Sequence, residues 1–203
     1  MTRQSLRDRM RDAVREELRE TAFAMFLESG YDAVSIEQIA AQAGVSPRTF
    51  FRYFPNKEDV LLEWFDHYGP AIYDAVRMAP ADMELFDVVR HAMARPAELS
   101  LYSQDELKRN RLASELITTS PRLRAGMAER RRTWETEIGR LLALRMNTAI
   151  DEDIGPAVLA SLAVNCAMVT VSWNIGTRRQ DGTVPEATTD DAFLALRKII
   201  TGK

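Results

Sequence analysis

The chain is poor in the residues that build disulfides and metal sites. It has a single cysteine, Cys166, and two histidines, His67 and His91, in 203 residues. One cysteine cannot form an intrachain disulfide, and two histidines far apart in the sequence provide no cluster of zinc ligands. No HExxH pattern or nucleophile elbow is present, and Cys166 lies in an apolar stretch, which is typical of a structural cysteine. The sequence therefore predicts no metal, no cofactor and no enzyme active site.

A strong net charge and an apolar leader are also missing. The formal net charge is -3, so any contact with DNA must be local and not spread over the whole surface. Positive charge gathers near the N-terminus at Arg3, Arg7, Arg9 and Arg11. A sequence this charged predicts no signal peptide. We expect a cytoplasmic protein.

One uncharged segment, Val158–Ile175, approaches the length of a membrane span. It carries several polar side chains, and no second span exists to receive them. A helix buried on several sides in a globular protein fits better. We therefore expect no membrane partner.

Alternating strand patterns and fixed-period repeats are absent, and the sequence predicts an all-α fold. A polar stretch, Arg178 to Thr188, is predicted to be a surface loop between the last two helices. The helices are predicted near residues 6–29, 35–43, 46–54, 56–65, 81–94, 103–119, 121–146, 156–177 and 189–201.

Two short helices joined by a glycine-centred turn are the most informative segment. Ser35 can cap the first helix while Gln38 reaches back to it, which is the capping-box arrangement. Gly44 supplies the positive φ that a tight turn needs. Ser46 is a good N-cap for the second helix, and Pro47 follows where its missing N–H costs nothing. The pattern predicts a helix-turn-helix, whose second helix enters the major groove of DNA.

The second helix carries candidate base-reading side chains. Arg48 can donate two hydrogen bonds to guanine O6 and N7, and Thr49 and Phe51 can contact a thymine methyl or a sugar edge. An isolated pair such as Arg48 and Arg52 would more often be a solvated helix face. The capped helices around the turn favour DNA contact instead.

Other side chains of this segment are assigned to phosphates or to the core. Tyr53 and Lys57 lie where phosphate contacts are expected, and the N–H groups at the helix that Ser35 opens add an anion site. Phe50 and Phe54 repeat at helical spacing on the opposite side. We expect these two rings to be core.

The segment SIEQIAAQAGVSPRTFFRYFPNK, residues 35–57, resembles the DNA-binding signature of the TetR family of bacterial regulators. The remainder of the chain agrees with that family only in being helical and of similar length. The resemblance implies a three-helix DNA-binding domain, here residues 1–56, followed by a helical ligand-binding and dimerisation domain, here residues 57–203. Such proteins usually act as repressors that a small-molecule effector releases from a double-stranded DNA operator.

The resemblance also implies roles for individual residues. Phe51 departs from the family pattern, because a tyrosine is common at its position, and the missing hydroxyl leaves apolar contact as its role. Carried over by position, base contacts fall on Arg48, Thr49, Phe51 and Arg52, and phosphate contacts on Ser35, Tyr53 and Lys57.

The second domain offers candidates for an effector pocket. Arg130 and Arg131 interrupt the apolar stripe of the helix that begins at Pro121. An arginine facing an interior pocket could bind the anionic head of a mostly apolar ligand, whereas the more common role of two such arginines is a solvated run or stems that lie along the surface. The residues predicted to line the pocket are Met127, Arg131, Trp134, Asn165, Met168 and Trp173.

The last two helices predict a homodimer. Val158–Ile175 is apolar nearly all round, and Phe193, Leu196, Ile199 and Ile200 supply the second helix of a four-helix interface. A two-fold dimer would present two recognition helices to a pseudo-palindrome at a spacing of about 34–36 Å.

Some alternatives stay open at this level. Gly69-Pro70 is predicted to end or kink a helix and to act as the pivot through which an effector moves the DNA-binding domain. The sequence does not distinguish a repressor from an activator, or DNA contact from protein contact through the helix-turn-helix. The effector is expected to be apolar or amphipathic.

Overall fold

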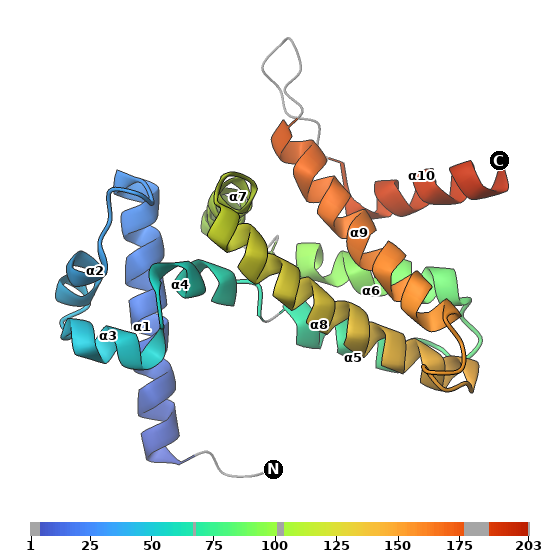
Figure 1. Cartoon of the computed structure of the whole chain (residues 1–203), viewed down its shortest axis with the longest axis horizontal. Coiled ribbons are helices and arrows are strands. Elements are labelled where there is room, and N and C mark those ends of the chain that lie inside the picture. Colours follow the sequence, from blue (N-terminus) through green and yellow to red (C-terminus); the bar gives the residue numbers. More distant parts are fainter. Residues whose placement is uncertain (1–4, 67, 101–103, 177–186, 203) are drawn as a thin grey trace. The chain divides into compact units, whose positions relative to one another are not determined.

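The computed structural model describes residues 5–66, 68–100, 104–176 and 187–202, and every regular element within them is an α-helix (Figure 1). This confirms the predicted all-α class. The chain divides into two compact units, Met1–Trp64 and Phe65–Lys203. Arg3, His67 and most of the loop predicted at 178–188 lie outside the described residues.

The first unit contains α1 (Leu6–Ser29), α2 (Ile36–Gln42), α3 (Pro47–Tyr53) and α4 (Lys57–Glu63). Ser5 caps α1 by accepting a hydrogen bond from the N–H of Asp8, and Gly30 ends the helix with a φ of 85°. The core lies against the C-terminal half of α1. Its largest fully buried side chains are Leu18, Phe23, Phe26, Ile39, Phe50 and Phe54.

The turn between α2 and α3 has the predicted geometry. Ser35 and Gln38 form a complete capping box at the start of α2. Gly44 adopts a φ of 68°, and the N–H of Val45 donates to the carbonyl of Ala40 over 2.9 Å, which closes the turn. Ser46 caps α3 by accepting from the N–H of Thr49. These local interactions fix the direction in which α3 leaves α2.

Helix α4 packs as part of the first unit. Arg15 of α1 pairs with Glu63 of α4, with Nε donating to Oε1 over 2.8 Å. The rings of Phe23 and Trp64 lie 5.3 Å apart, and Val60 is fully buried. Because of these contacts α4 belongs to the first unit. The boundary along the chain therefore follows Trp64, one short helix beyond the boundary predicted between residues 56 and 57.

The second unit contains six helices in its described part. The long helix α8 packs against α5, α7 and α9, while α6 packs against α5, α9 and α10. The helices are α5 (Tyr68–Met78), α6 (Leu85–Ser100), α7 (Gln104–Thr119), α8 (Pro121–Met146), α9 (Gly155–Gly176) and α10 (Thr189–Thr201).

The prediction that Gly69-Pro70 ends or kinks a helix is wrong. Helix α4 already ends at Glu63, and Gly69 and Pro70 lie in the first turn of α5. Proline is tolerated there because the first turn has no intrahelical partner for its missing N–H. Gly69 is needed for packing, since a Cβ on it would lie 2.9 Å from Nε1 of Trp134 in α8.

Helix α9 is long and apolar enough to cross a membrane by length and composition, and about a third of that segment, 33%, is buried within the described residues. It packs on α6, α8 and α10, and its polar side chains fix the chain that leads into α10. Asn174 donates to the carbonyl of Ala187 and accepts from its N–H, at 2.8 and 3.0 Å. These two bonds link the end of α9 to the segment that begins α10.

Phe193 of α10 is not available to a second chain. It is 1% exposed, and its ring lies 5.6 Å from that of Phe86 in α6. The prediction that Phe193 contributes to an intermolecular interface is therefore wrong, because the ring completes the core of its own unit. Ile199 and Ile200, from the same predicted set, are 80% and 66% exposed.

Candidate nucleic-acid interface

Helix α3 has one buried and one exposed face. Phe50 and Phe54 are both 0% exposed, which confirms their prediction as core residues. Arg48 and Arg52 are exposed, and so is the ring of Phe51, at 51%. A large aromatic ring that faces solvent beside two arginines is an unusual surface, because burial would stabilise the ring. It suits a face that contacts a ligand both by charge and by apolar surface.

The N-terminal turn of α3 is held by a short polar network. The N–H of Thr49 donates to Oγ of Ser46 over 3.1 Å, and the two side-chain hydroxyls lie 3.0 Å apart. Thr49 is half-buried. Its hydroxyl is therefore engaged in the cap, and its methyl group is the part of the side chain suited to a thymine contact.

Arg52 and Tyr53 interact with each other at the C-terminal end of α3. One terminal nitrogen of Arg52 lies 3.3 Å from the hydroxyl of Tyr53, and its guanidinium lies 5.0 Å from the centre of that ring. The contact orients the guanidinium and leaves its other donors available. These two neighbours can serve a base edge and an adjacent phosphate together.

Ser35 is occupied by its cap. Its Oγ accepts from the N–H of Gln38 at 3.2 Å, and its own N–H donates to Oε1 of Gln38 at 2.8 Å. The hydroxyl hydrogen of Ser35 is left to donate to an anion. Contact between Ser35 and a phosphate stays a prediction.

Lys57 is placed differently from the predicted phosphate contacts. Its Nζ donates to the carbonyl oxygens of Tyr31 and Val34, at 2.7 and 2.8 Å, and lies 4.1 Å from the centre of the Tyr31 ring. The side chain is half-buried. Two of its three donors therefore stabilise the chain between α1 and α2. Sequence reasoning missed this role because the two carbonyls belong to a distant segment.

The predicted pocket residues of the second unit fall into several environments. Met127 and Trp134 are buried, whereas Trp173 is 53% exposed. Arg131 and Asn165 are brought together, with the guanidinium donating to Oδ1 of Asn165 over 2.8 Å. Met168 is half-buried. That all six line one effector pocket stays a prediction.

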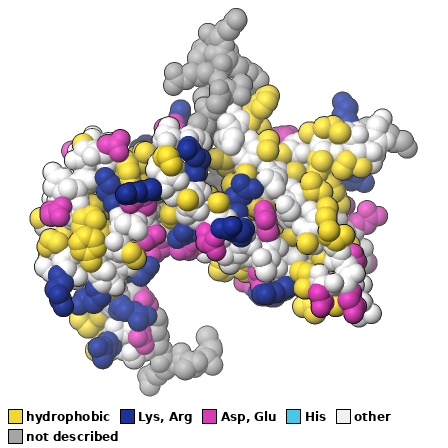
Figure 2. All heavy atoms as spheres, in the orientation of Figure 1, with side chains coloured by type: hydrophobic (Ala, Val, Ile, Leu, Met, Phe, Trp, Pro, Cys, Tyr) yellow, Lys and Arg dark blue, Asp and Glu magenta, His cyan; other side chains and the backbone are white. Residues whose placement is uncertain are grey.

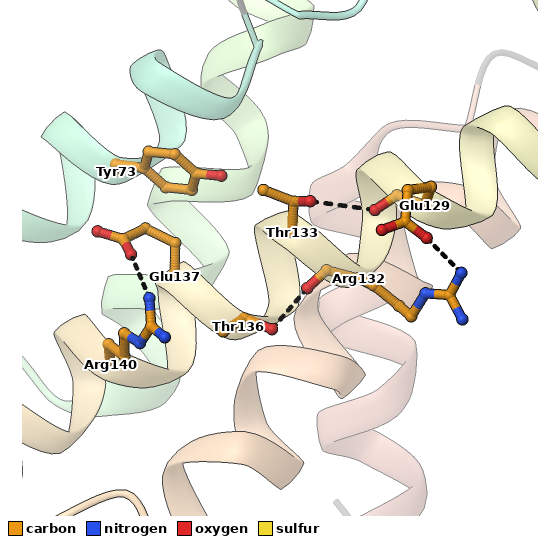
Figure 3. Close-up of a pocket in the computed structure, with 7 residues that line it drawn as sticks. All are labelled: Tyr73, Glu129, Arg132, Thr133, Thr136, Glu137 and Arg140. Atoms are coloured by element: carbon orange, nitrogen blue, oxygen red, sulfur yellow. Dashed lines mark hydrogen bonds and ion pairs between the residues drawn. The ribbon is translucent and has the colours of Figure 1, made fainter.

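Two of the hollows are lined by residues within the described part of the chain, and the lining of these two includes none of those six predicted residues. One, of about 410 Å³, lies between α5 and α8, and the other, of about 390 Å³, lies between α5 and α6. The first is lined by Tyr73, Glu129, Arg132, Thr133, Thr136, Glu137 and Arg140 (Figure 3). The second is lined by Ala71, Asp74, Ala75, Met78, Ala79, Pro80, Met83, His91 and Arg95.

The residues that line the hollow between α5 and α8 all carry polar or charged groups, and the charges are paired along α8. Arg132 pairs with Glu129, and Arg140 lies 3.6 Å from Glu137 (Figure 3). Burial and the nearby Glu137 carboxylate raise the pKa of Tyr73 above its ordinary value. The tyrosine therefore stays a neutral hydrogen-bonding group at physiological pH.

Arg130 has a partner that sequence reasoning did not find. Its Nε donates to Oδ1 of Asp66 over 2.6 Å, which ties α8 to the segment before α5. In the same unit, the hydroxyl of Tyr68 donates to Oδ1 of Asn110 in α7 over 2.7 Å. The interruption of the apolar stripe at Arg130 is thus explained by an internal ion pair.

Comparison with known proteins agrees with this architecture. The family model for bacterial regulatory proteins of the tetR family matches residues 18–64, and the model for the MftR C-terminal domain matches residues 83–196. The HTH-type transcriptional regulator TcmR of Streptomyces glaucescens is 29% identical over 161 residues, which cover 77% of this chain and 71% of TcmR.

Solved structures show the same fold. GusR of Salmonella enterica is 18% identical, with a TM-score of 0.57 and coverage of 94% of each chain. FadR of Thermus thermophilus, a TetR-family repressor solved in complex with lauroyl-CoA, is 23% identical, with a TM-score of 0.53 and coverage of 93% of this chain and 94% of FadR.

The two family models follow one another along the chain and correspond to its two compact units. The second model alone spans more than half of the 203 residues. Together with the helix-turn-helix of α2 and α3, these matches show that the chain belongs to the TetR family of bacterial transcriptional regulators, which are DNA-binding proteins with a C-terminal ligand-binding domain and are not enzymes.

Proposed function

We propose that the protein is a ligand-responsive repressor that binds a pseudo-palindromic operator as a homodimer and is released by a small apolar or amphipathic effector. The observation that carries this proposal is the face of α3, where Arg48, Phe51 and Arg52 are exposed around a buried core. A short helix capped at its N-terminus can enter the major groove and place such side chains on base edges.

Arg48 is the strongest candidate for sequence reading. It is exposed in the first turn of α3, and it makes no hydrogen bond or ion pair with any residue that the structure describes. Its planar guanidinium is therefore free to donate both bonds to guanine. Thr49, Phe51 and Arg52 complete the base-contacting set, with Tyr53 and Ser35 as phosphate contacts.

Dimer formation is supported by apolar surface that a single chain leaves uncovered. Helices α9 and α10 expose several large apolar side chains, and burial of each in an interface would contribute about 1–3 kcal/mol. Repeated burial of such side chains favours two copies packed face to face. These exposed residues are Val158, Leu162, Val169, Val171, Trp173, Leu194, Ile199 and Ile200.

The nature of the effector is inferred from the second unit and from a structural relative. FadR binds lauroyl-CoA, an apolar chain with an anionic head. Arg131, bonded to Asn165 and 3.9 Å from Glu135, is the cation we assign to such a head. Its Nε is buried without a hydrogen-bond partner. Met127 and Trp134 are the apolar side chains that we assign to contact with the apolar chain of the effector.

The DNA-binding part of the proposal is tested by selecting duplexes from a random library with the purified full-length protein. Fluorescence anisotropy then measures affinity for the selected duplex and for a scrambled one. We expect Arg48→Ala to lose about 1–3 kcal/mol of binding free energy and to relax preference at one base position. Phe51→Ala should weaken binding with a smaller loss of preference. Equal binding of selected and scrambled duplexes by the wild type would contradict the proposal.

The homodimer is tested by light scattering coupled to gel filtration. The wild type should have twice the 23.0 kDa mass of one chain. Val169→Glu on α9 should shift it toward the monomer, whereas Leu144→Glu, an equally apolar and 76% exposed site on α8, should leave the dimer intact. A monomeric wild type, or equal dissociation in both variants, would refute the assigned interface.

The effector class is tested by native mass spectrometry of protein purified from its own host. An added mass that is lost on mild activation and extracts into organic solvent is expected. Adding the extracted molecule should release the selected duplex, and Arg131→Gln should weaken that release. A polar metabolite in its place would overturn the assignment of effector class while leaving DNA binding unaffected.

A further inference from the structure

The N-terminal half of α1 projects beyond the core of the first unit. No side chain from Leu6 to Glu17 is buried, and Leu18 is the first buried residue of the helix. At about 1.5 Å per residue this projection is about 18 Å long. Figure 1 shows it passing the end of α3 and continuing on the side away from α2. Within this segment Arg15 ties α1 to Glu63 and to the Phe54 ring, whereas no residue from Leu6 to Asp12 is buried in the core.

Arginines recur at every fourth position along α1, at Arg7, Arg11, Arg15 and Arg19. Residues four apart on a helix lie on one face, so these side chains form a row. Arg15 shows where the row points, because its guanidinium lies 4.8 Å from the centre of the Phe54 ring at the end of α3. Arg7 and Arg11 lie two turns and one turn further out on the same face, beyond the end of α3.

Arg7 and Arg11 are available to bind phosphate, because the acidic residues near them do not hold them in strong ion pairs. Arg7 forms no ion pair or hydrogen bond with any residue in the described ranges, and Arg11 lies 3.7 Å from Asp12 with both side chains more than half exposed. An exposed pair of this kind is worth about 0–1 kcal/mol, so a phosphate can compete for the arginine. Asp8 is engaged by Ser5, whose hydroxyl donates to it over 2.7 Å.

The recognition helix alone offers few cations for the DNA backbone. Arg48 and Arg52 are its exposed basic residues, and Lys57 is held by two carbonyls of its own unit. Phosphate contacts supply most of the affinity of proteins for duplex DNA. Figure 2 shows Lys and Arg side chains gathered on one side of the first unit, over α3 and the N-terminal half of α1.

We infer that Arg7 and Arg11 bind phosphates of the duplex outside the segment that α3 reads. Each chain then covers a longer stretch of DNA than its recognition helix alone. The row of arginines, the 18 Å projection at about 1.5 Å per residue and the position of Arg15 against α3 together direct both side chains past the recognition helix. This inference rests on the proposed binding of DNA through α3.

The test measures how affinity for a labelled mixed-sequence duplex, several helical turns long, depends on salt. The slope of log K against log salt concentration is negative, and each lost phosphate contact reduces its magnitude by about 0.9. The double variant Arg7→Gln, Arg11→Gln should therefore reduce the magnitude of the slope by about 1.8 per chain. Glutamine keeps the helix propensity of arginine, and circular dichroism checks that α1 stays helical.

Arg9→Gln is the matched control. Arg9 is exposed on the same projecting segment, but at about 100° per residue it points roughly 160° away from both Arg7 and Arg11. It should leave the slope unchanged. The variant with lysine at both positions, Arg7→Lys and Arg11→Lys, should retain most of the wild-type slope, because an ammonium still contacts a phosphate.

The outcomes separate this inference from the proposed function. If the wild type shows no salt-dependent binding to any duplex, the proposed function fails. If the wild type binds and Arg48→Ala loses base preference while the double variant keeps the wild-type slope, only the role of Arg7 and Arg11 is overturned. An equal loss of slope per charge in Arg9→Gln would also overturn it, because it would indicate a general field and not a directed contact.

Discussion

Replacing Lys57 with methionine distinguishes an internal role of this residue from a phosphate contact. Methionine keeps an unbranched apolar stem and removes the ammonium. The carbonyls of Tyr31 and Val34, 2.7 and 2.8 Å from Nζ, then lose their charged donor. Both of these residues are buried, at 9% and 3% exposure, so water can replace the ammonium only in part.

The magnitude follows from these contacts. Hydrogen bonds to charged groups contribute about 1.5–3 kcal/mol each. The ammonium at 4.1 Å from the Tyr31 ring adds about 0.5–1 kcal/mol at a partly exposed site. Because Lys57 is only half-buried, rehydration offsets part of this sum, and we expect Lys57→Met to cost about 2–3 kcal/mol. This corresponds to a factor of about 30–150 in the opening equilibrium of the first unit.

Amide hydrogen exchange followed by mass spectrometry is the assay, because it reports both units in one sample. Peptides from the core of the first unit, residues 18–64, should lose about 30–150-fold in protection, while those from α8 and α9 should not change. Arg52→Ala is the control. Arg52 is an exposed cation of the same unit, so its removal should weaken DNA binding and leave protection unaltered.

The opposite pattern would refute this reasoning. If Lys57→Met leaves protection within about threefold of the wild type and yet lowers the salt dependence of DNA binding, Lys57 is a phosphate contact as the sequence predicts. Equal loss of protection in both units would also count against it, because the contacts of Lys57 lie within the first unit alone.

Two further predictions concern the second unit. Gly69→Ala should destabilise the second unit by about 1–3 kcal/mol, because the new Cβ would lie 2.9 Å from Nε1 of Trp134 and force the indole to move. Urea unfolding measures this loss of stability, and an unchanged unfolding midpoint would contradict the prediction. The pKa of Asp191 is lowered by hydrogen bonds from the backbone and side chain of Thr188. Its contribution to the stability of α10 is therefore present above the ordinary value of 3.8 and lost as pH falls through the lower folded value. An NMR titration of the Thr188 amide should show a midpoint below 3.8, and a midpoint above it would refute the cap.

Helix boundaries set by local capping could be predicted from the sequence. The predicted and observed bounds agree for α1, α8 and α10, where Ser5, Ser120 and Thr188 act as N-caps and Gly30 and Gly202 end two of the helices. The signals there involve residues a few positions apart, so no tertiary contact has to be known. The helix-turn-helix was recognisable for the same reason.

Features that depend on contacts between distant segments could not be predicted. The partner of Arg130 is Asp66, and the carbonyls that hold Lys57 precede it by two helices. The sequence predicts a helix break at Gly69 and Pro70, whereas both lie in the first turn of α5, where Gly69 packs closely against Trp134 of the distant α8. For Arg130 and Lys57, the sequence alone does not reveal the partners that occupy these side chains in the fold.

The candidate effector pocket shows the same limitation. Each of Arg131 and Asn165 is predicted from its own helix alone, and the structure joins them by a hydrogen bond of 2.8 Å. Trp173, a large and mostly apolar side chain, is 53% exposed on α9. Apolar periodicity identifies side chains that are expected to be buried. It does not show whether the protein core, a ligand or a second chain buries them.

Hydroxyl-radical footprinting of the full-length protein on its selected duplex tests the central claim most directly. Two copies of α3, each led by Arg48, should protect two windows related by a dyad and separated by about 34–36 Å, or one helical turn. Arg48→Ala should reduce protection in both windows together. A single window, or protection that Arg48→Ala leaves unchanged, would contradict recognition of DNA by paired α3 helices.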